Sequence, residues 1–562
     1  MTSHMSSLQS FFLLAPEIVL VAAALVAFLG GAFAGLRSGW GVAVIGIVAA
    51  MMVSGGQPPE GAWVASGGIR IDAFSTLIRW LVLGLGAILA LIQSGDLFPA
   101  AATRGNGFGG AAHRTGSTCE EAGTFLILLA GLSLTAVADD LVLLFMGLEL
   151  VSIPTYVMLA LKRTDAGGQE ASLKYFFLSL VASGLFLYAA VCLYGIGGST
   201  SLAVIGEGLR SSARADIARA LVPVAVGMTL AGAAFRLAAV PMHFYAPDVY
   251  EGTAPSNAAL LSTLPKVAGI VVLVRVLALA MAPGEAAEPA SAAAVFHMQV
   301  FWPLATLLAA ITMTVGNVMA LMQRNLRRLL ACSSIAHAGY LLVGVAAAAA
   351  AAAARADTGG PGDGDTSWTL GLGGLTATLF YLATYALATA GIFAALTYLG
   401  HRWPEWTAAS GPRPPREEIT VVDDLDGLSA TNPVVAFAIA LFLLSLAGIP
   451  PLPGFWGKLS LATSALEVDW NAPIVLGSRR AWFVSLAVML VLNAAIAAAY
   501  YLRIIAAMYF RPNRRGVQAD GGIAAGVAML VCTALVLMVT MQPRGLYVSC
   551  VRAGDAIEKA PR

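Results

Sequence analysis

The sequence is poor in charged residues and has no polar stretch long enough to form a separate soluble domain. Only 11% of its 562 residues are charged, whereas 59% are hydrophobic and the mean hydropathy is +0.81. Such a chain has too little polar surface to cover a soluble globule. The net charge of +1 gives no basic field for nucleic acid. The composition therefore predicts a polytopic membrane protein.

Signals for metal centres and for signal-peptide cleavage are also absent. The five cysteines form no C-x-x-C pair, which argues against a zinc or iron–sulfur site. No lysine or arginine occurs in the first 36 residues, and no small-residue cleavage site follows the first apolar run. We therefore expect that run to be retained as a membrane span. The cysteines are Cys119, Cys192, Cys332, Cys532 and Cys550.

About fourteen apolar stretches are long enough to cross the hydrocarbon core as helices, which takes about twenty residues each. They cover residues 11–36, 39–54, 73–94, 122–137, 140–161, 172–196, 220–244, 254–281, 299–321, 326–350, 369–399, 430–464, 481–510 and 521–543.

Basic residues gather in loops that follow odd-numbered spans. Short basic loops are retained on the cytoplasmic side. The acidic loop around Asp357, Asp363 and Asp365 falls on the opposite side, so we expect both termini to lie outside. The basic loop residues are Lys162, Arg163, Arg324, Arg327, Arg328, Arg511, Arg514 and Arg515.

Residues 231–266 contain an interrupted span. An apolar helix is predicted to run through Arg236, to break, and to be followed by a second apolar helix that carries Lys266. Charges and freed backbone groups need partners or water in hydrocarbon. The sequence LAAVP at 237–241 is matched by LAGIP at 446–450, also within an apolar span. Two interrupted helices in corresponding halves are typical of inverted-repeat transporters and indicate a path for ions.

Lysine is scarce, since 27 of the 32 basic residues are arginines. Three of the five lysines, Lys174, Lys266 and Lys458, nevertheless lie inside predicted spans. Burial favours proton loss from lysine, whereas arginine stays charged, so we predict that these lysines titrate. Two simpler explanations stay open: the lysines extend from helix ends to the interface, or Lys174 forms a helix-stabilising pair with Glu170.

Two further titratable residues lie within predicted spans. A carboxylate such as Glu149 must be protonated or paired at that depth. His337 can titrate or bridge water near neutral pH, although an intramembrane histidine is often only a hydrogen-bonded packing residue. A Glu and a Lys about 6 Å apart attract by roughly 2.8 kcal/mol at an effective dielectric near 20, and by half that at about 12 Å. Modest motion of Glu149 relative to a lysine can therefore load or release a proton.

Five segments carry a family resemblance: LELVSIPTYVMLAL, EASLKYFFLSLVASG, FRLAAVPMHFYAPDVYEGTAPSNAALLSTLPK, GNVMALMQRNLRRLLACSSIAHAGYLLVG and LFLLSLAGIPPLPGFWGKL. Together they resemble subunit N of the proton-pumping NADH:quinone oxidoreductase, respiratory complex I. The resemblance covers nearly the whole chain and is strongest from about 120 to 510. APDVYEG is the most specific part, because the sister antiporter-like subunits share the broken helices but differ at that loop.

The resemblance implies an all-α polytopic membrane fold of fourteen helices with two inverted five-helix repeats. Residues 1–121 would hold the first three helices, 122–281 the first repeat, 299–510 the second, and 511–562 the last helix and tail. It implies proton translocation across the bacterial inner membrane, coupled to quinone reduction in other subunits. Quinone, flavin, NADH and iron–sulfur clusters are then expected in partner subunits, with no cofactor in this chain. Its neighbours would be antiporter-like and small helical membrane subunits.

Carried over residue by residue, the resemblance also implies a proton relay. Glu149 matches the channel carboxylate, and Lys174 and Lys266 match the two input-side lysines. His337 matches the histidine between the half-channels, and Lys458 the lysine of the second broken helix near the exit.

Arg236 departs from the family pattern, which usually has lysine at this position. Arginine supplies a field but hardly a transferable proton. We therefore expect Arg236 to be a fixed electrostatic partner of Glu149.

Three other function classes remain open from the sequence. A multisubunit cation/proton antiporter shares the broken helices. A solute transporter is less favoured, because no substrate-specific set of polar residues is visible. A structural membrane spacer would carry the same lysines as inert residues.

Overall fold

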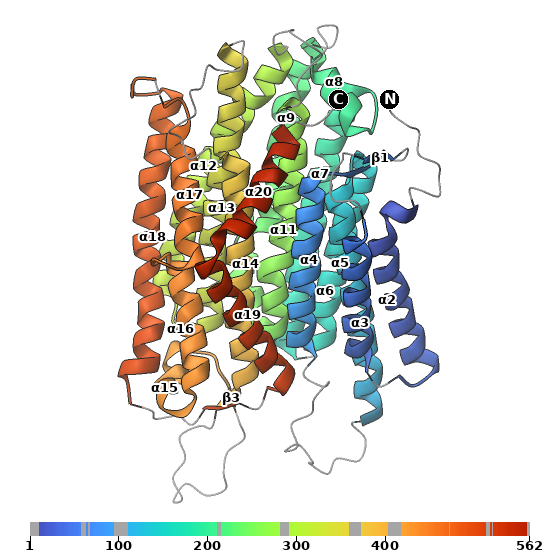
Figure 1. Cartoon of the computed structure of the whole chain (residues 1–562), viewed down its shortest axis with the longest axis vertical. Coiled ribbons are helices and arrows are strands. Elements are labelled where there is room, and N and C mark those ends of the chain that lie inside the picture. Colours follow the sequence, from blue (N-terminus) through green and yellow to red (C-terminus); the bar gives the residue numbers. More distant parts are fainter. Residues whose placement is uncertain are drawn as a thin grey trace, which may run out of the picture.

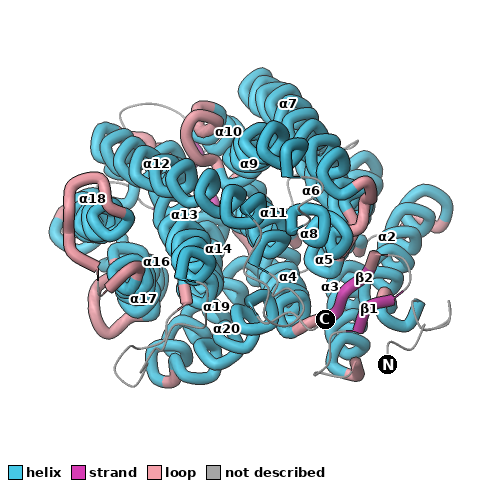
Figure 2. Tube along the Cα trace, turned by 90° about the horizontal axis from the view of Figure 1, so that it is seen from above, coloured by secondary structure: helices cyan, strands magenta, loops and turns pink. Residues whose placement is uncertain are grey.

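The computed structural model describes residues 11–36, 38–57, 63–65, 68–94, 111–163, 165–210, 215–281, 292–358, 373–402, 417–470, 472–512, 517–519 and 521–558. Long helices stand side by side in one bundle, with α2 (Ala15–Phe33) and α18 (Arg479–Phe510) at opposite edges (Figures 1 and 2). Twelve helices of the described ranges are long and apolar enough to cross a membrane. This confirms the predicted all-α polytopic membrane fold.

Each predicted span corresponds to a helix or to two helices separated by a break. Besides α2 and α18 these are α3 (Gly39–Gly55), α4 (Ala73–Gln93), α5 (Ala111–Val137), α6 (Leu141–Lys162), α7 (Ala166–Gly197), α9 (Ala215–Leu237) with α10 (Tyr245–Gly252), α11 (Pro255–Met281), α12 (Ala292–Met322), α13 (Leu326–Thr358), α14 (Gly374–Leu399), α16 (Pro433–Ala447) with α17 (Pro453–Glu467), and α19 (Ile523–Met541).

The connections contain smaller elements that hydropathy does not predict. Strands β1 (Trp63–Ala65) and β2 (Ile69–Ile71) pair antiparallel, with Trp63 opposite Ile71. A second sheet has the order β4 (Glu417–Glu418), β3 (Gly400–Arg402), β5 (Val517–Ala519). The remaining elements of the described ranges are α8 (Leu202–Arg210), the 3-10 helix η3 (Val422–Leu425), α15 (Leu428–Thr431) and the C-terminal helix α20 (Pro543–Glu558).

The predicted basic loops meet at one end of the bundle. Arg163 and Arg327 both form ion pairs with Glu418, at 3.4 and 3.0 Å, and Arg511 pairs with Asp423 at 2.6 Å. We call this the basic end; it also holds the β4-β3-β5 sheet, at the bottom of Figure 1. Arg514, Arg515 and the acidic residues Asp363 and Asp365 lie outside the described residues.

The two interrupted spans run in opposite directions. Helix α10 reaches the basic end, where Glu251 accepts a hydrogen bond from Arg328 at 2.7 Å. Helix α16 instead begins at the basic end, where Asn432 donates to the carbonyl of Val517 at 3.2 Å. The chain leaves the helical conformation at Ala238 (φ 57°) in the first break and at Gly448 (φ 86°) in the second. This opposition is the geometry expected of inverted repeats, although the proposed boundaries at 122–281 and 299–510 stay a prediction.

Helices α11, α13 and α14 form the centre of the bundle (Figure 2). Glycines let α12, α13 and α14 approach closely, as small residues do in membrane helix packing. A Cβ on Gly316 would lie 2.4 Å from the backbone nitrogen of Ala336, and one on Gly339 would lie 2.4 Å from that of Met313. The approach brings polar side chains of three helices within mutual reach.

A buried ion pair fixes the N-terminal helices. Arg79 of α4 donates to both carboxylate oxygens of Glu17 in α2, and Ser133 of α5 donates to the same carboxylate at 2.5 Å. Removing one partner of a buried pair leaves an uncompensated charge, which is costly. The pair therefore holds α2 and α4 against α5.

We expect Gly339→Ala to destabilise the protein although alanine is the better helix former. The new methyl group would meet the backbone of Met313, and overpacking of this kind costs about 1–3 kcal/mol. Gly184→Ala is the matched control, because nothing lies within 4 Å of its Cβ position. The melting temperature in detergent should fall for Gly339→Ala only; equal melting temperatures would refute the close approach.

Candidate functional site

The two buried lysines bind the carbonyl ends of the two interrupted helices. Lys266 of α11 donates to the carbonyl of Leu237, the last residue of α9. Lys458 of α17 donates to the carbonyls of Leu446 and Ala447 at the end of α16, at 2.8 and 3.1 Å. The last carbonyls of a helix lack intrahelical partners and favour cations. Because Leu237 and Leu446 open the repeated sequences LAAVP and LAGIP, the two contacts are equivalent.

Neither lysine reaches the surface. Lys266 is 1% exposed and Lys458 is 5% exposed, so the interpretation that they extend to the interface is wrong for these two residues. Their ammonium groups lie near aromatic rings instead: Lys266 Nζ is 6.0 Å from the centre of the Tyr385 ring, and Lys458 Nζ is 4.8 Å from that of Tyr340. Such rings attract cations without themselves carrying charge.

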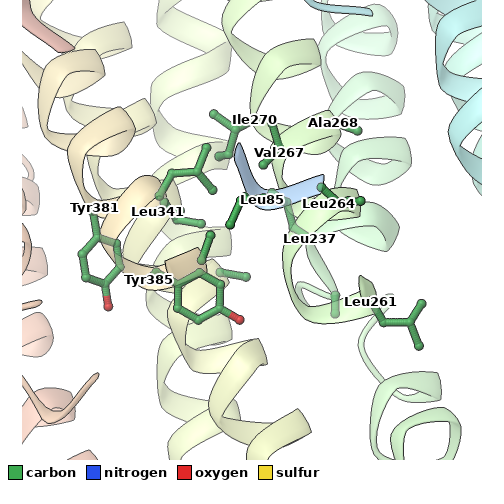
Figure 3. Close-up of a cluster of buried hydrophobic side chains, with 14 of the residues drawn as sticks. Leu85, Leu237, Leu261, Leu264, Val267, Ala268, Ile270, Leu341, Tyr381 and Tyr385 are labelled. Atoms are coloured by element: carbon green, nitrogen blue, oxygen red, sulfur yellow. The ribbon is translucent and has the colours of Figure 1, made fainter. Parts of the chain in front are cut away.

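His337 of α13 lies between these lysine sites and is held by two tyrosines. Its Nδ1 is 2.5 Å from the hydroxyl of Tyr381, and its Nε2 is 2.9 Å from that of Tyr501. Its ring also packs on Tyr385, with 4.8 Å between ring centres. Figure 3 shows Tyr381 and Tyr385 projecting from α14 beside buried apolar side chains such as Leu341. The imidazole is 1% exposed and has both nitrogens engaged.

An asparagine joins the remaining tyrosines to this group. Asn317 of α12 donates to Tyr340 and to Asn493, at 3.0 and 3.1 Å, and accepts from Tyr500 at 3.0 Å. Sequence reasoning missed the tyrosines and Asn317. The only sequence signal was that these residues occur inside apolar spans; Tyr381 and Tyr385, for example, are four residues apart on α14. Tyrosines that serve only in packing would show the same pattern.

Glu149 and Arg236 form the neighbouring pair that the sequence predicts. Arg236 Nη2 lies 3.9 Å from Glu149 Oε1, and its Nη1 donates to Ser152 at 2.7 Å. Ser183 donates to the same carboxylate oxygen of Glu149. Since Arg236 precedes Leu237, the end of α9 contacts both this pair and Lys266.

Lys174 lies elsewhere, in an exposed cluster at the basic end. It pairs with Glu170 at 2.7 Å and with Asp248 at 2.8 Å, and its side chain is 38% exposed. Arg328 joins Asp248 to Glu251, at 2.9 and 2.7 Å. The structure thus forms the predicted i,i+4 pair with Glu170 and does not bring Lys174 together with the buried lysines.

Known proteins share this architecture. The family model described as NADH:quinone oxidoreductase/Mrp antiporter, TM, matches residues 138–356 and 367–483. NADH-quinone oxidoreductase subunit N of Methylobacterium nodulans is 33% identical over 528 residues, which are 93% of this chain and 92% of that protein. The chain belongs to the NADH-quinone oxidoreductase subunit N family. The Myxococcus xanthus member is 31% identical over 550 residues, 96% of each chain.

Solved structures extend the family likeness to the fold. A chain of respiratory complex I from Thermus thermophilus with bound aureothin has a TM-score of 0.68 and 26% identity, and the match covers 95% of this chain and 98% of that one. A chain of the Mrp complex from Dietzia sp. has a TM-score of 0.71 at 21% identity, with 99% and 98% covered. The latter likeness concerns the fold alone. The resemblance seen in the sequence is confirmed, and the chain is an antiporter-like membrane subunit of complex I.

In this subunit N homologue, we expect Arg236→Lys to keep most proton pumping, because a cation still faces Glu149. Arg236→Met keeps side-chain length but removes the charge, so it should reduce pumping strongly. Dye-detected acidification of inverted vesicles that contain the assembled complex measures both. If the two variants lost pumping equally, the charge of Arg236 would not be what matters.

Proposed function

We propose that this chain moves protons across the bacterial inner membrane through Lys266, His337 and Lys458, coupled to quinone reduction in other subunits. One observation carries the proposal: three protonatable groups, none more than 5% exposed, are connected by tyrosine side chains. In the part of the chain that the structure describes, no carboxylate pairs with either lysine. The relatives named NADH-quinone oxidoreductase subunit N support the coupling to quinone reduction.

Electrostatic repulsion between protonated groups of the Lys266–His337–Lys458 relay provides the driving interaction. Two unit charges about 10 Å apart repel by roughly 1.7 kcal/mol at an effective dielectric near 20. Repulsion of this size lowers the proton affinity of each of the two groups by more than about tenfold. A proton that arrives at Lys266 therefore favours release from a protonated group further along the row. His337 suits the middle position, since an imidazole accepts a proton on one nitrogen and releases one from the other.

The Glu149–Arg236 pair supplies a second, adjustable field. Glu149 is 25% exposed on α6, whose outer surface also exposes the apolar Met146 and Ile153. A partly exposed carboxylate at membrane depth can also bind a cation of a neighbouring membrane subunit, in competition with Arg236. Movement of Glu149 away from Arg236 would leave the positive field of Arg236 uncompensated beside the Lys266 site.

The basic end is assigned to the cytoplasm, because short basic loops stay on that side. The first described residues of α2 and the last of α20 lie toward the opposite end (Figure 1), which supports an outside location for both termini. Quinone, flavin, NADH and iron–sulfur clusters belong to partner subunits in this proposal. Antiporter-like and small helical membrane subunits are the neighbours of this chain.

Lys266→Ala and Lys458→Ala should each abolish or strongly reduce proton pumping, because each removes a relay site. Lys162→Ala is the matched control, since Lys162 pairs with Glu121 at the basic end and is 27% exposed. Acidification of inverted vesicles should be measured per assembled complex, with NADH oxidation by an artificial acceptor reporting assembly. Normal pumping by both buried-lysine variants would reject the proposed path.

A cation/proton antiporter is the second candidate, favoured by the matching family model, whose description names the Mrp antiporter beside NADH:quinone oxidoreductase. We expect no Na⁺ flux from vesicles that contain this chain without redox partners. Na⁺ flux there would favour the antiporter. Unchanged proton flux after joint replacement of Glu149, Lys266 and Lys458 would instead indicate an inert spacer.

A further inference from the structure

A row of hydroxyl groups lies between the basic end and the buried lysine–histidine group. The Tyr250 hydroxyl on α10 is 3.4 Å from Ser334 Oγ on α13, and Ser334 Oγ is 2.8 Å from the Tyr385 hydroxyl on α14. Each of the three residues is 2% exposed. Three helices thus contribute one hydroxyl each to a connected row.

The inner end of this row touches the proposed relay. Tyr385 is the residue whose ring lies 6.0 Å from Lys266 Nζ and packs at a tilt against the His337 ring. Its hydroxyl donates to the carbonyl of Ser262 at 3.1 Å, so its oxygen can still accept a hydrogen bond from Ser334. The Tyr385 ring therefore adjoins both Lys266 and His337, while its hydroxyl faces the Ser262 carbonyl of α11, the helix that carries Lys266.

The outer end of the row begins at the ionic cluster of the basic end. Tyr250 lies on α10 between Asp248 and Glu251, whose side chains are 38% and 42% exposed and bind Arg328. One short helix therefore carries solvent-accessible carboxylates and, on the same turn, a buried hydroxyl. Along α13, the eleven helical steps from Leu326 to His337 span roughly 16 Å.

Thr253 is a buried polar residue three positions after Tyr250, and its carbonyl accepts a hydrogen bond from Arg327 at 2.6 Å. It follows α10 at the basic end and is 1% exposed, and its Oγ1 has no hydrogen-bond partner among the described residues. A buried hydroxyl without a partner costs about 1–3 kcal/mol. Such groups are commonly satisfied by ordered water. A water at Thr253 would lie one turn from Tyr250, on the side of the ionic cluster.

We propose that Tyr250, Ser334 and Tyr385, reached through water at Thr253, form the proton uptake route from the basic end to Lys266 and His337. Each hydroxyl accepts a proton from its outer neighbour and releases its own to its inner neighbour. Tyr385 releases its proton to the Lys266 amine through a bridging water, because the Ser262 carbonyl to which its hydroxyl donates cannot take up a proton. No group keeps a charge, and no oxidant or reductant takes part. Rotation of the hydroxyls restores the row for the next proton. This route rests on the proposed function, since it delivers protons to that relay.

Tyr250→Phe and Ser334→Ala remove one hydroxyl each and leave the surrounding packing nearly unchanged. In the assembled complex, the double variant should acidify inverted vesicles at least about tenfold more slowly than wild type, as expected for loss of a proton-transfer group. Ser334→Thr keeps the hydroxyl and should retain pumping. Ser464→Ala is the matched control, because the buried Ser464 hydroxyl binds the carbonyl of Leu461 in its own helix and lies outside the route.

Thr253→Val separates a transport role from a structural one. Valine has the same shape, suits the extended backbone at this position and removes a buried hydroxyl that lacks a partner. The variant should melt at the same or a higher temperature than wild type and still pump more slowly. A purely structural role predicts unchanged or improved pumping, so that result would overturn the route even if the double variant failed to assemble.

Lys266→Ala, measured alongside, distinguishes failure of the route from failure of the proposed function. If Lys266→Ala stops pumping while the Tyr250→Phe/Ser334→Ala variant and Thr253→Val both pump like wild type, only the route is wrong. If Lys266→Ala also pumps normally, the relay itself is wrong.

Discussion

The carbonyl groups freed where α9 and α16 end inside the bundle are the constraint on which the rest of the structure depends. Hydrocarbon offers these carbonyls no hydrogen-bond donor, so the protein must supply one. Lys266 and Lys458 do so at the equivalent positions Leu237 and Leu446. A break in a span and a buried ammonium, each costly alone, thereby compensate each other. This mutual compensation explains why each interrupted helix is accompanied by a buried lysine.

The same contacts link protonation to the shape of the interrupted spans. A protonated lysine has three N–H donors and a full charge facing the negative end of a helix, whereas a neutral amine loses that charge. Proton loss from Lys266 would therefore weaken the contact that holds the end of α9. Arg236 lies next to Leu237 at this end and faces Glu149. A change in the charge of Lys266 therefore acts on the Glu149–Arg236 pair through the last turn of α9, and a change in that pair acts on Lys266.

The sequence could predict the spans, the breaks and the depth of Lys266, Lys458 and Glu149, because each follows from local hydropathy and from the cost of charge in oil. The environment of His337 could not be predicted. Tyr381 and Tyr501 lie 44 and 164 residues from it, and only the close packing of α13 with its neighbours brings their hydroxyls to its ring. The position of Lys174 also depended on tertiary structure, since Asp248 arrives from α10, 74 residues away.

The partners of the buried cations divide into two kinds, and the division follows from whether the charge must change. Arg79 and Arg275 are 2% exposed and pair with the carboxylates of Glu17 and Asp72. A carboxylate suits a permanent cation, but it would be left as an unpaired buried charge if its partner lost a proton. Carbonyls and aromatic rings remain neutral in both states, so they tolerate both an ammonium and an amine. Lys266 and Lys458 have only partners of this second kind among the described residues. Their surroundings are therefore compatible with either protonation state, which a proton relay requires and a static anchor does not.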